Sequence, residues 1–242
     1  MAGRGQLDGQ TVVVIGGSSG IGLETARLAC TEGANVVITG RDEKRLESAA
    51  NDVGATSAAF DATDFDLLAG FFAELPGPID QVLVTGPGPY YAPLSEFDFD
   101  AGRRDVEAHL FLPMQVARGA GPKVRAGGTL LFIGGTGGRA AGVGMTLISA
   151  LTAAGPAMVR NLALELAPVR VNMIAAGFVD TPLSATLLGG RVEERRDELR
   201  RTLPIGRVIG PADIALLAVQ LMTNTAVTGA TFDIDGGQQL VT

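Results

Sequence analysis

Residues 11–22 read TVVVIGGSSGIG, and this stretch decides the fold. The run at 11–15 is short and β-branched, which predicts a strand buried on both faces. A helical pattern follows at about 21–31, and a second β-branched run covers 35–39. Strand, helix and strand within about 30 residues predict a βαβ unit, and the glycine-rich turn inside such a unit is a typical phosphate site.

The glycine-rich turn is predicted to bind the pyrophosphate of a dinucleotide. The first turn of a helix leaves backbone N–H groups without acceptors and carries a partial positive charge. Glycines allow an anion to approach these groups closely. The predicted contacts are Gly16, Ser18, Ser19, Gly20, Ile21 and Gly22. A turn with a structural role alone is the alternative interpretation.

The end of the second strand distinguishes NAD(H) from NADP(H). An acidic side chain there accepts hydrogen bonds from the ribose 2′-OH, whereas a basic one accommodates the 2′-phosphate of NADP. Residues 39–41 read TGR, and the permanent charge of Arg41 favours NADP(H) over NAD(H). In the alternative, Asp42 caps the next helix and Arg41 is only solvated. After the third strand, Asp61 and Ala62 are expected near the adenine, with helix capping as the alternative for Asp61.

Short apolar runs and helix-length segments continue to alternate along the chain. Five further strands are predicted at residues 57–60, 81–84, 128–133, 170–174 and 231–234. Strands without polar alternation are typical of a parallel sheet covered on both faces. We therefore predict an α/β fold, a Rossmann-type three-layer αβα sandwich with a seven-stranded parallel sheet. No linker interrupts the pattern, so residues 1–242 are expected to form a single domain.

Composition and charge narrow the possible functions. Of the 242 residues, 46% are hydrophobic and 34 are glycine, which is sufficient for a buried core and favours close backbone approach. The net charge of −7 gives no electrostatic basis for binding nucleic acid. The N-terminal residues lack an apolar signal region, and no apolar run is long enough for a bilayer. We expect a cytoplasmic protein with neither a membrane partner nor a bound metal.

Two stretches depart from the alternation. Residues 180–203 follow the sixth strand, carry alternating charges and are long for a connection, which predicts a mobile lid. A solvated helical hairpin without a role in ligand binding is the alternative. Residues 134–144 hold six glycines, so their backbone is either flexible or closely approached by another part of the chain.

Together these features resemble the short-chain dehydrogenase/reductase family over nearly the whole chain. The resembling pieces are the glycine-rich turn, residues 40–41, Asp61, and residues 170–172, 176–182, 205–207 and 228–237. The resemblance implies a nicotinamide cofactor, a small-molecule substrate and a homodimer or homotetramer. It also implies cofactor contacts from Gly86 and from Gly177, Val179 and Thr181, although Ala176 replaces the family's proline.

The resemblance places other residue types at the family's catalytic positions. The family uses an asparagine, a serine, a tyrosine and a lysine. Counted back from Glu165 by the family's spacing, the lysine position holds Thr152 and the tyrosine position holds Ile148. The serine position holds Gly135, and the asparagine position falls on His109. General acid catalysis is typically worth about 10²–10⁴-fold, so the usual carbonyl reduction is expected to be lost while cofactor binding survives.

Two residues are candidates for a replacement proton donor. His109 is the only histidine and titrates near neutrality, although a packed helix histidine is the alternative. Tyr90 and Tyr91 follow Pro89 on the loop after the fourth strand, where this fold exposes residues to the substrate pocket. Tyr90 is the second catalytic candidate, with packing as its alternative. The residues around Ile148 predict a more apolar pocket than is usual.

Two functions remain open at this point. The first is an NADP(H)-binding oxidoreductase with an atypical active site, which transfers a hydride to an apolar acceptor such as an activated C=C bond, an iminium or a quinone-like compound. The second is a catalytically inactive NADPH-binding sensor, or a partner subunit that contacts an active relative through residues 228–242. Sustained oxidation of NADPH would distinguish the first from the second.

Overall fold

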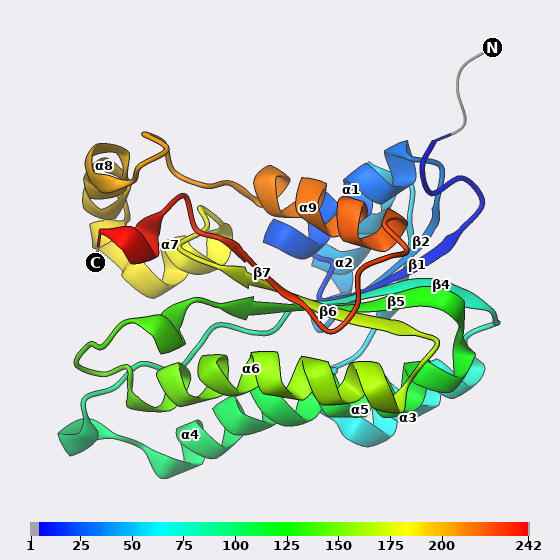
Figure 1. Cartoon of the computed structure of the whole chain (residues 1–242), viewed down its shortest axis with the longest axis horizontal. Helices are drawn as coiled ribbons and strands as arrows, with labels where there is room; N and C mark the ends of the chain where they lie inside the picture. The colour runs from blue at the N-terminus through cyan, green and yellow to red at the C-terminus, as the bar shows by residue number, and fades with distance from the viewer. Residues whose placement is uncertain (1–4, 242) are drawn as a thin grey trace.

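The computed structural model describes residues 5–241, so residues 1–4 and 242 of the predicted domain lie outside it. Seven parallel strands form one sheet in the order β3-β2-β1-β4-β5-β6-β7 (Figure 1). The strands are β1 (Thr11–Ile15), β2 (Asn35–Gly40), β3 (Thr56–Ala59), β4 (Ile79–Val84), β5 (Val124–Gly135), β6 (Arg170–Ala176) and β7 (Thr231–Ile234). The predicted fold class is confirmed, and every predicted strand overlaps one of these.

Helices cover both faces of the sheet (Figure 1). One face carries α1 (Gly20–Thr31), α2 (Glu43–Val53) and α9 (Pro211–Thr223). The other carries α3 (Phe65–Glu74), α4 (Phe99–Val106), α5 (Leu112–Ala120) and α6 (Thr146–Glu165). The last two helices, α7 (Pro182–Leu188) and α8 (Val192–Thr202), lie beyond the carboxyl ends of the strands. A π-helix at Glu107–Phe111 joins α4 to α5.

The strand β1 shows why an uninterrupted apolar run was needed. Val12 and Val14 pack into the core under α1 and α9, whereas Val13 and Ile15 pack into the core on the opposite face. All four side chains are buried. Successive side chains of a strand point to opposite faces, so a strand covered by helices on both sides has no polar position.

The place for a ligand follows from the strand order. The chain runs outward from β1 to β3 and then returns to place β4 directly beside β1. The connections after β1 and β4 therefore lead to opposite faces of the sheet, and a crevice opens outside the carboxyl ends of these strands. The glycine-rich turn after β1 and the loop after β4 both border this crevice.

Residues 170–172, one of the motifs on which the resemblance to the family rests, have a structural role. Arg170 is only 5% exposed, and its guanidinium donates hydrogen bonds to the carbonyls of Leu221 and Met222 near the end of α9. Asn172 donates to the carbonyl of Val227 in the segment that leads to β7. Helix C-termini leave carbonyls without partners, and arginine satisfies them. This motif fastens the last helix and strand to the sheet.

Within residues 5–241, α6 is the one helix whose length and composition would allow it to cross a bilayer. The same helix packs against β5 and β6 and buries Ile148, Leu151 and Val159. The core helix of a globular domain passes the same test of length and composition, so this feature is weak support for a membrane span.

Candidate active site

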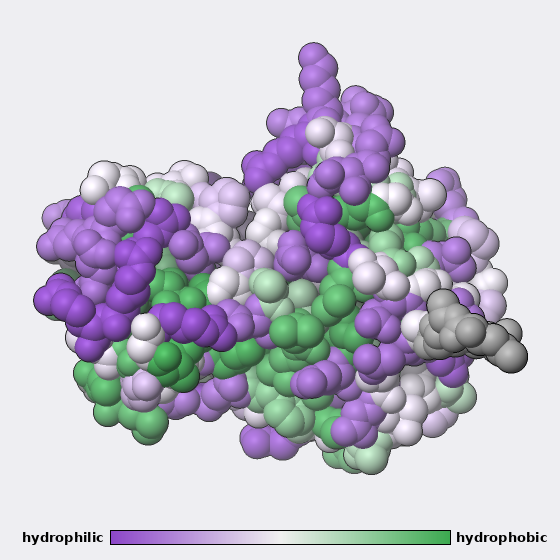
Figure 2. Space-filling model, turned by 90° about the horizontal axis from the view of Figure 1, so that it is seen from above, coloured by the Kyte–Doolittle hydropathy of each residue, from purple (hydrophilic) through white to green (hydrophobic). Residues whose placement is uncertain are grey.

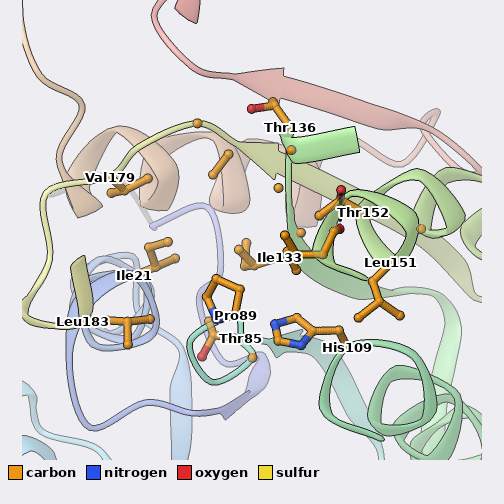
Figure 3. A pocket seen from close by; sticks show the side chains of 18 of the residues that line it. Ile21, Thr85, Pro89, His109, Ile133, Thr136, Leu151, Thr152, Val179 and Leu183 are labelled. Atoms are coloured by element: carbon orange, nitrogen blue, oxygen red, sulfur yellow. Dashed lines mark hydrogen bonds between the residues drawn. The ribbon is translucent and has the colours of Figure 1, made fainter. Parts of the chain in front are cut away.

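Two cavities open at the carboxyl ends of the strands and share one wall. The cradle cavity, about 370 Å³, is lined by the glycine-rich turn and the ends of β2 and β3. The inner cavity, about 490 Å³, lies between the end of β5, α6, the π-helix and α7 (Figure 3). The residues that line both cavities are Ile21, Thr85, Gly86, Pro87, Thr181 and Leu183. A molecule in the cradle can therefore extend into the inner cavity.

The glycine-rich turn is shaped by close backbone approach. Gly16 has φ +89°, a left-handed conformation that glycine adopts without strain, and a Cβ there would lie 2.2 Å from Oγ1 of Thr85. A Cβ on Gly22 would lie 2.1 Å from the carbonyl oxygen of Gly16. Side chains are excluded at both positions. The predicted contacts from Gly16 to Gly22 all line the cradle cavity, and so do Arg41, Asp61, Ala62 and Gly86.

The first turn of α1 presents backbone donors that no side chain satisfies. Its N-cap, Ser19, makes no side-chain hydrogen bond to the helix, and no acidic residue lies in the first turn. In contrast, α2 and α3 begin with the side chains of Asp42 and Asp64, which accept hydrogen bonds from their first turns. The free N–H groups of α1 and its positive dipole end thus face the cradle, as an anion site requires.

The structure answers two questions that the sequence left open in the cradle. Asp42 accepts a hydrogen bond from the backbone N–H of Arg45 at 3.0 Å, so it does cap α2. Arg41 nevertheless lines the cradle, together with Arg45. Asp61 accepts from the N–H and hydroxyl of Thr63, at 3.0 and 2.8 Å, and does not cap α3. Arg41, Arg45 and the turn-forming carboxylate of Asp61 therefore line the cradle at the ends of β2 and β3.

The inner cavity brings together the four residues predicted at the family's catalytic positions. Gly135 ends β5, Ile148 and Thr152 lie one turn apart on α6, and His109 lies in the π-helix; all four line the cavity. A Cβ on Gly135 would lie 3.4 Å from Cγ2 of Thr152, which is ordinary contact. The Thr152 hydroxyl donates to the Ile148 carbonyl at 2.8 Å. Gly138, which follows Gly135 in the glycine-rich stretch, lies close to α6. A Cβ on Gly138 would lie 2.8 Å from backbone atoms of that helix.

His109 is held by a buried carboxylate. Its Nδ1 lies 3.0 Å from Oδ1 of Asp105, whose side chain is 4% exposed. Burial alone would lower the pKa of His109, but hydrogen bonds and charge from Asp105, with the Pro87 carbonyl, raise the pKa above its ordinary value. Figure 3 shows the imidazole directed toward the loop that carries Thr85 and Pro89. A Cβ on Gly86 would lie 3.6 Å from Nε2, so that nitrogen faces the wall shared by both cavities.

Tyr90, which was predicted as a catalytic candidate, is not among the residues that line either cavity. Its hydroxyl accepts a hydrogen bond from the backbone N–H of Asp98 at 2.9 Å, and its ring packs edge-on against Phe97. These contacts favour the alternative interpretation, in which Tyr90 has a packing role. Tyr91 lines the inner cavity instead. Burial and the negative charge of Asp105 raise the pKa of Tyr91, so its hydroxyl keeps its proton at neutral pH.

Segment 180–203 folds as two helices and borders the site. Leu183, Ser184 and Leu187 of α7 line the inner cavity, as does Arg195 of α8. The segment therefore borders the cavity, and both the mobile lid and the hairpin without a role in ligand binding stay predictions. The remaining predicted contacts after β6, which are Gly177, Val179 and Thr181, also line this cavity. Across residues 5–241, no three His, Cys, Asp or Glu side chains gather as metal ligands.

A parallel α/β sheet with a glycine-rich turn and a site at the switch point defines a class of dinucleotide-binding proteins. The family described as "Enoyl-(Acyl carrier protein) reductase" has a sequence model that matches residues 15–239. The chain belongs to the short-chain dehydrogenase/reductase family of oxidoreductases.

Relatives of known sequence or structure match over nearly their full length. The short-chain dehydrogenase/reductase ATR9 of Stachybotrys chlorohalonatus is 29% identical over 251 residues, covering 96% of this chain and 97% of that protein. BdcA in complex with NADPH is 29% identical with a TM-score of 0.86, covering 96% of this chain and 95% of that one. A single-residue variant of actinorhodin polyketide ketoreductase with NADPH is 27% identical with a TM-score of 0.87, covering 99% of both.

Proposed function

We propose that the protein is an NADP(H)-dependent oxidoreductase with an atypical active site. The observation that carries this proposal is the shared wall between a cradle suited to a dinucleotide and an apolar cavity that contains His109. The cradle fits the cofactor because its glycines exclude side chains and α1 presents free N–H groups. Two similar proteins, BdcA and actinorhodin ketoreductase, have solved structures with NADPH.

Each part of the cradle has a proposed role. The backbone from Gly16 to Gly22 binds the pyrophosphate, and Asp61 with Ala62 borders the adenine. Arg41, assisted by Arg45, pairs with the 2′-phosphate and so favours NADP(H) over NAD(H). Gly86 and Thr181 of the shared wall, with Gly177 and Val179 of the inner cavity, contact the nicotinamide half. When bound, the nicotinamide supplies or accepts a hydride.

The atypical chemistry follows from the side chains at the four proposed catalytic positions. Gly135 and Ile148 have no proton to donate, and the Thr152 hydroxyl is engaged by its own helix. His109 remains as the acid, with Nδ1 held by Asp105 and Nε2 carrying the proton toward the shared wall. An acceptor with low demand for acid catalysis fits this arrangement, such as an activated C=C bond, an iminium or a quinone-like compound.

A second candidate function uses the cradle alone. The missing acid groups also fit a catalytically inactive NADPH sensor or partner subunit, for which residues 228–242 are the proposed contact surface. Sustained oxidation of NADPH in a panel of acceptors supports the enzyme, whereas tight binding without oxidation supports the sensor. The mobile lid at 180–203, the homodimer or homotetramer and the cytoplasmic location stay predictions.

The cofactor preference is tested by thermal unfolding. NADPH should raise the melting temperature more than NADH does, and Arg41→Ala should reduce the NADPH effect to that of NADH. Losing one charge-assisted contact at this exposed position should weaken NADPH binding about tenfold. Arg160→Ala is the matched control, since Arg160 is an exposed arginine on α6 that lines neither cavity.

Equal shifts from both cofactors in the unaltered protein would reject the preference for NADP(H). If neither cofactor raised the melting temperature at millimolar concentration, the oxidoreductase and the sensor would both be rejected.

A further inference from the structure

The helix α8 has two arginines on its inner face. Its charges alternate in sequence, but the residues that are at least half-buried recur at helical spacing: Val192, Arg195, Arg196 and Leu199. The outer positions are exposed charged residues, and Figure 2 shows hydrophilic side chains gathered over this helix, at the left of the view. A solvated helix needs no cation on its inner stripe, so these two arginines require an explanation.

One of the two arginines pairs with carboxylates of the fold through both of its terminal nitrogens. Arg196 donates to Asp180 at 2.6 Å and also pairs with Glu193, so it ties α8 to the segment that follows β6. Arg195 is different, because it lines the inner cavity. Its guanidinium contacts Glu198 at 2.6 Å, and the Glu198 side chain is 49% exposed. Exposed ion pairs of this kind contribute little free energy, so Arg195 can exchange Glu198 for another anion at small cost.

The rest of the inner cavity leaves Arg195 without a competing partner. Among the described lining residues, Arg195 is the one side chain with a permanent charge, and none is a carboxylate. Two hydroxyl groups that line the cavity are engaged elsewhere: Thr85 donates to the carbonyls of Ile15 and Gly16, and Ser184 donates to the carbonyl of Thr181. An apolar wall with a single fixed cation selects a molecule with an apolar body and one anionic group.

We propose that Arg195 binds an anionic group of the substrate, so that the inner cavity accepts organic anions with an apolar body rather than neutral molecules of the same shape. This inference names a substrate class for the proposed oxidoreductase and rests on that proposed function. The planar guanidinium has paired donors that match a carboxylate or a phosphate monoester. Because Arg195 belongs to the segment predicted to be a lid, the same contact would couple substrate binding to the position of α8.

The test compares probes that share one apolar body. Octanoate, octyl phosphate and octanamide are titrated below their micelle concentrations, and dissociation constants are measured by ligand-observed NMR. The ring signals of His109 report whether a probe enters the inner cavity, because the chain has one histidine. Octanoate or octyl phosphate should bind about tenfold more tightly than octanamide, as expected for one charge-assisted contact.

Variants distinguish the effect of Arg195 on anion binding from the effect of the other charges of α8. Arg195→Ala should remove the preference for the anion and leave octanamide binding unchanged, while Arg195→Lys should keep part of the preference. Arg200→Ala is the matched control, because Arg200 pairs with Asp197 on the same helix and does not line the cavity. The tighter of the two anions identifies the headgroup as a carboxylate or a phosphate.

Several results would overturn the inference. These are equal binding of octanoate, octyl phosphate and octanamide, a preference that survives Arg195→Ala, and the absence of any detectable anion binding. The NADPH-induced rise in melting temperature is measured on the same samples. Its absence rejects the proposed function, whereas its presence without discrimination between the probes rejects the anion site alone.

Discussion

The cradle cavity is formed mainly by backbone, whereas the inner cavity is formed mainly by side chains. The cradle depends on a continuous turn after β1, in which Gly16 and Gly22 are fixed by backbone contacts and α1 supplies free N–H groups. The inner cavity is assembled from side chains on β5, α6, the π-helix, α7 and α8. The binding proposed for the first region relies on backbone, so it should survive substitutions that change the chemistry of the second. In the proposed function, catalysis can therefore change while the cofactor site is kept.

The largest expected effect comes from placing the family's acid groups at three of the four positions proposed to be catalytic. Gly135→Ser, Ile148→Tyr and Thr152→Lys together should produce slow reduction of ketones with NADPH. A Cβ on Gly135 meets only ordinary contacts, so serine fits at that position. General acid catalysis is worth about 10²–10⁴-fold, which sets the expected gain in the rate of NADPH oxidation.

Gly135→Ser alone serves as the control for this experiment, because it adds a hydroxyl without an acid. A triple variant that binds NADPH but gains no ketone reduction would contradict the proposal that missing acid groups are the one obstacle to ketone reduction.

The cradle should tolerate added side-chain atoms far less well than the inner cavity does. Gly22→Ala places a methyl group 2.1 Å from the carbonyl oxygen of Gly16, and the turn must distort to relieve this contact. Overpacking of this kind costs about 3 kcal/mol, which corresponds to about 100-fold weaker binding if the distortion falls on the phosphate site. Calorimetric titration with NADPH measures any loss of binding affinity, and thermal unfolding measures any loss of stability.

Gly70→Ala is the matched control for the glycine turn. Gly70 is an exposed residue of α3, and an added Cβ there has nothing within 4 Å in the described chain. That variant should bind NADPH normally and be slightly more stable, by up to about 1 kcal/mol. Unchanged NADPH binding and stability in Gly22→Ala would contradict the role of close packing in the turn.

Sequence reasoning succeeded where one local pattern determines one local structure. The apolar run of β1 predicted a strand buried on both faces, and the glycine spacing predicted the turn before α1. Capping of α2 by Asp42 is confirmed, and it leaves Arg41 at the cradle, where its contact with a 2′-phosphate stays a prediction. Such features need only neighbours in the chain, so the sequence contains the information.

The inner cavity was predicted less completely because its residues meet only in three dimensions. Tyr90 and Tyr91 are adjacent in sequence, yet the hydrogen bond from the Asp98 N–H turns Tyr90 away while Tyr91 lines the cavity. Asp105 was missed as the partner of His109, although its spacing of four residues in a helical region is a usable signal. The position of Arg195 at the cavity was not predicted, because the alternating charges of residues 191–201 are typical of a solvated helix.

A smaller effect is expected from the carboxylate that holds His109. Because the pKa of His109 is raised in the folded protein, its ion pair with Asp105 stabilises the fold fully below the unfolded-state pKa of about 6.5. This contribution is lost as the pH rises through the folded-state pKa. Asp105→Asn should lower the pKa of His109 and weaken this pH dependence, since Arg195 and Tyr91 in the same cavity supply no negative charge at neutral pH.

The measurement is direct because the chain contains a single histidine, whose ring signals can be followed by NMR across the pH range. Asp100→Asn is the control, since Asp100 is an exposed carboxylate that pairs with Arg103 on the same helix. A pKa of His109 that stays the same in Asp105→Asn would show that the backbone carbonyls of Asp105 and Pro87, and not the Asp105 carboxylate, hold the proton.

The smallest effect concerns Thr181, which belongs to both regions. It lines the two cavities, and its hydroxyl caps α7 by accepting a hydrogen bond from the Ser184 N–H at 3.2 Å. Thr181→Val keeps the shape of the side chain and removes the cap, at a cost of about 1 kcal/mol and about 2–4 °C in melting temperature. Thr181→Ser keeps the hydroxyl and should lose much less stability. If NADPH contacts this hydroxyl, the valine variant should also show a smaller NADPH-induced shift than the serine variant. Equal shifts in both would assign the Thr181 hydroxyl to the capping of α7 alone.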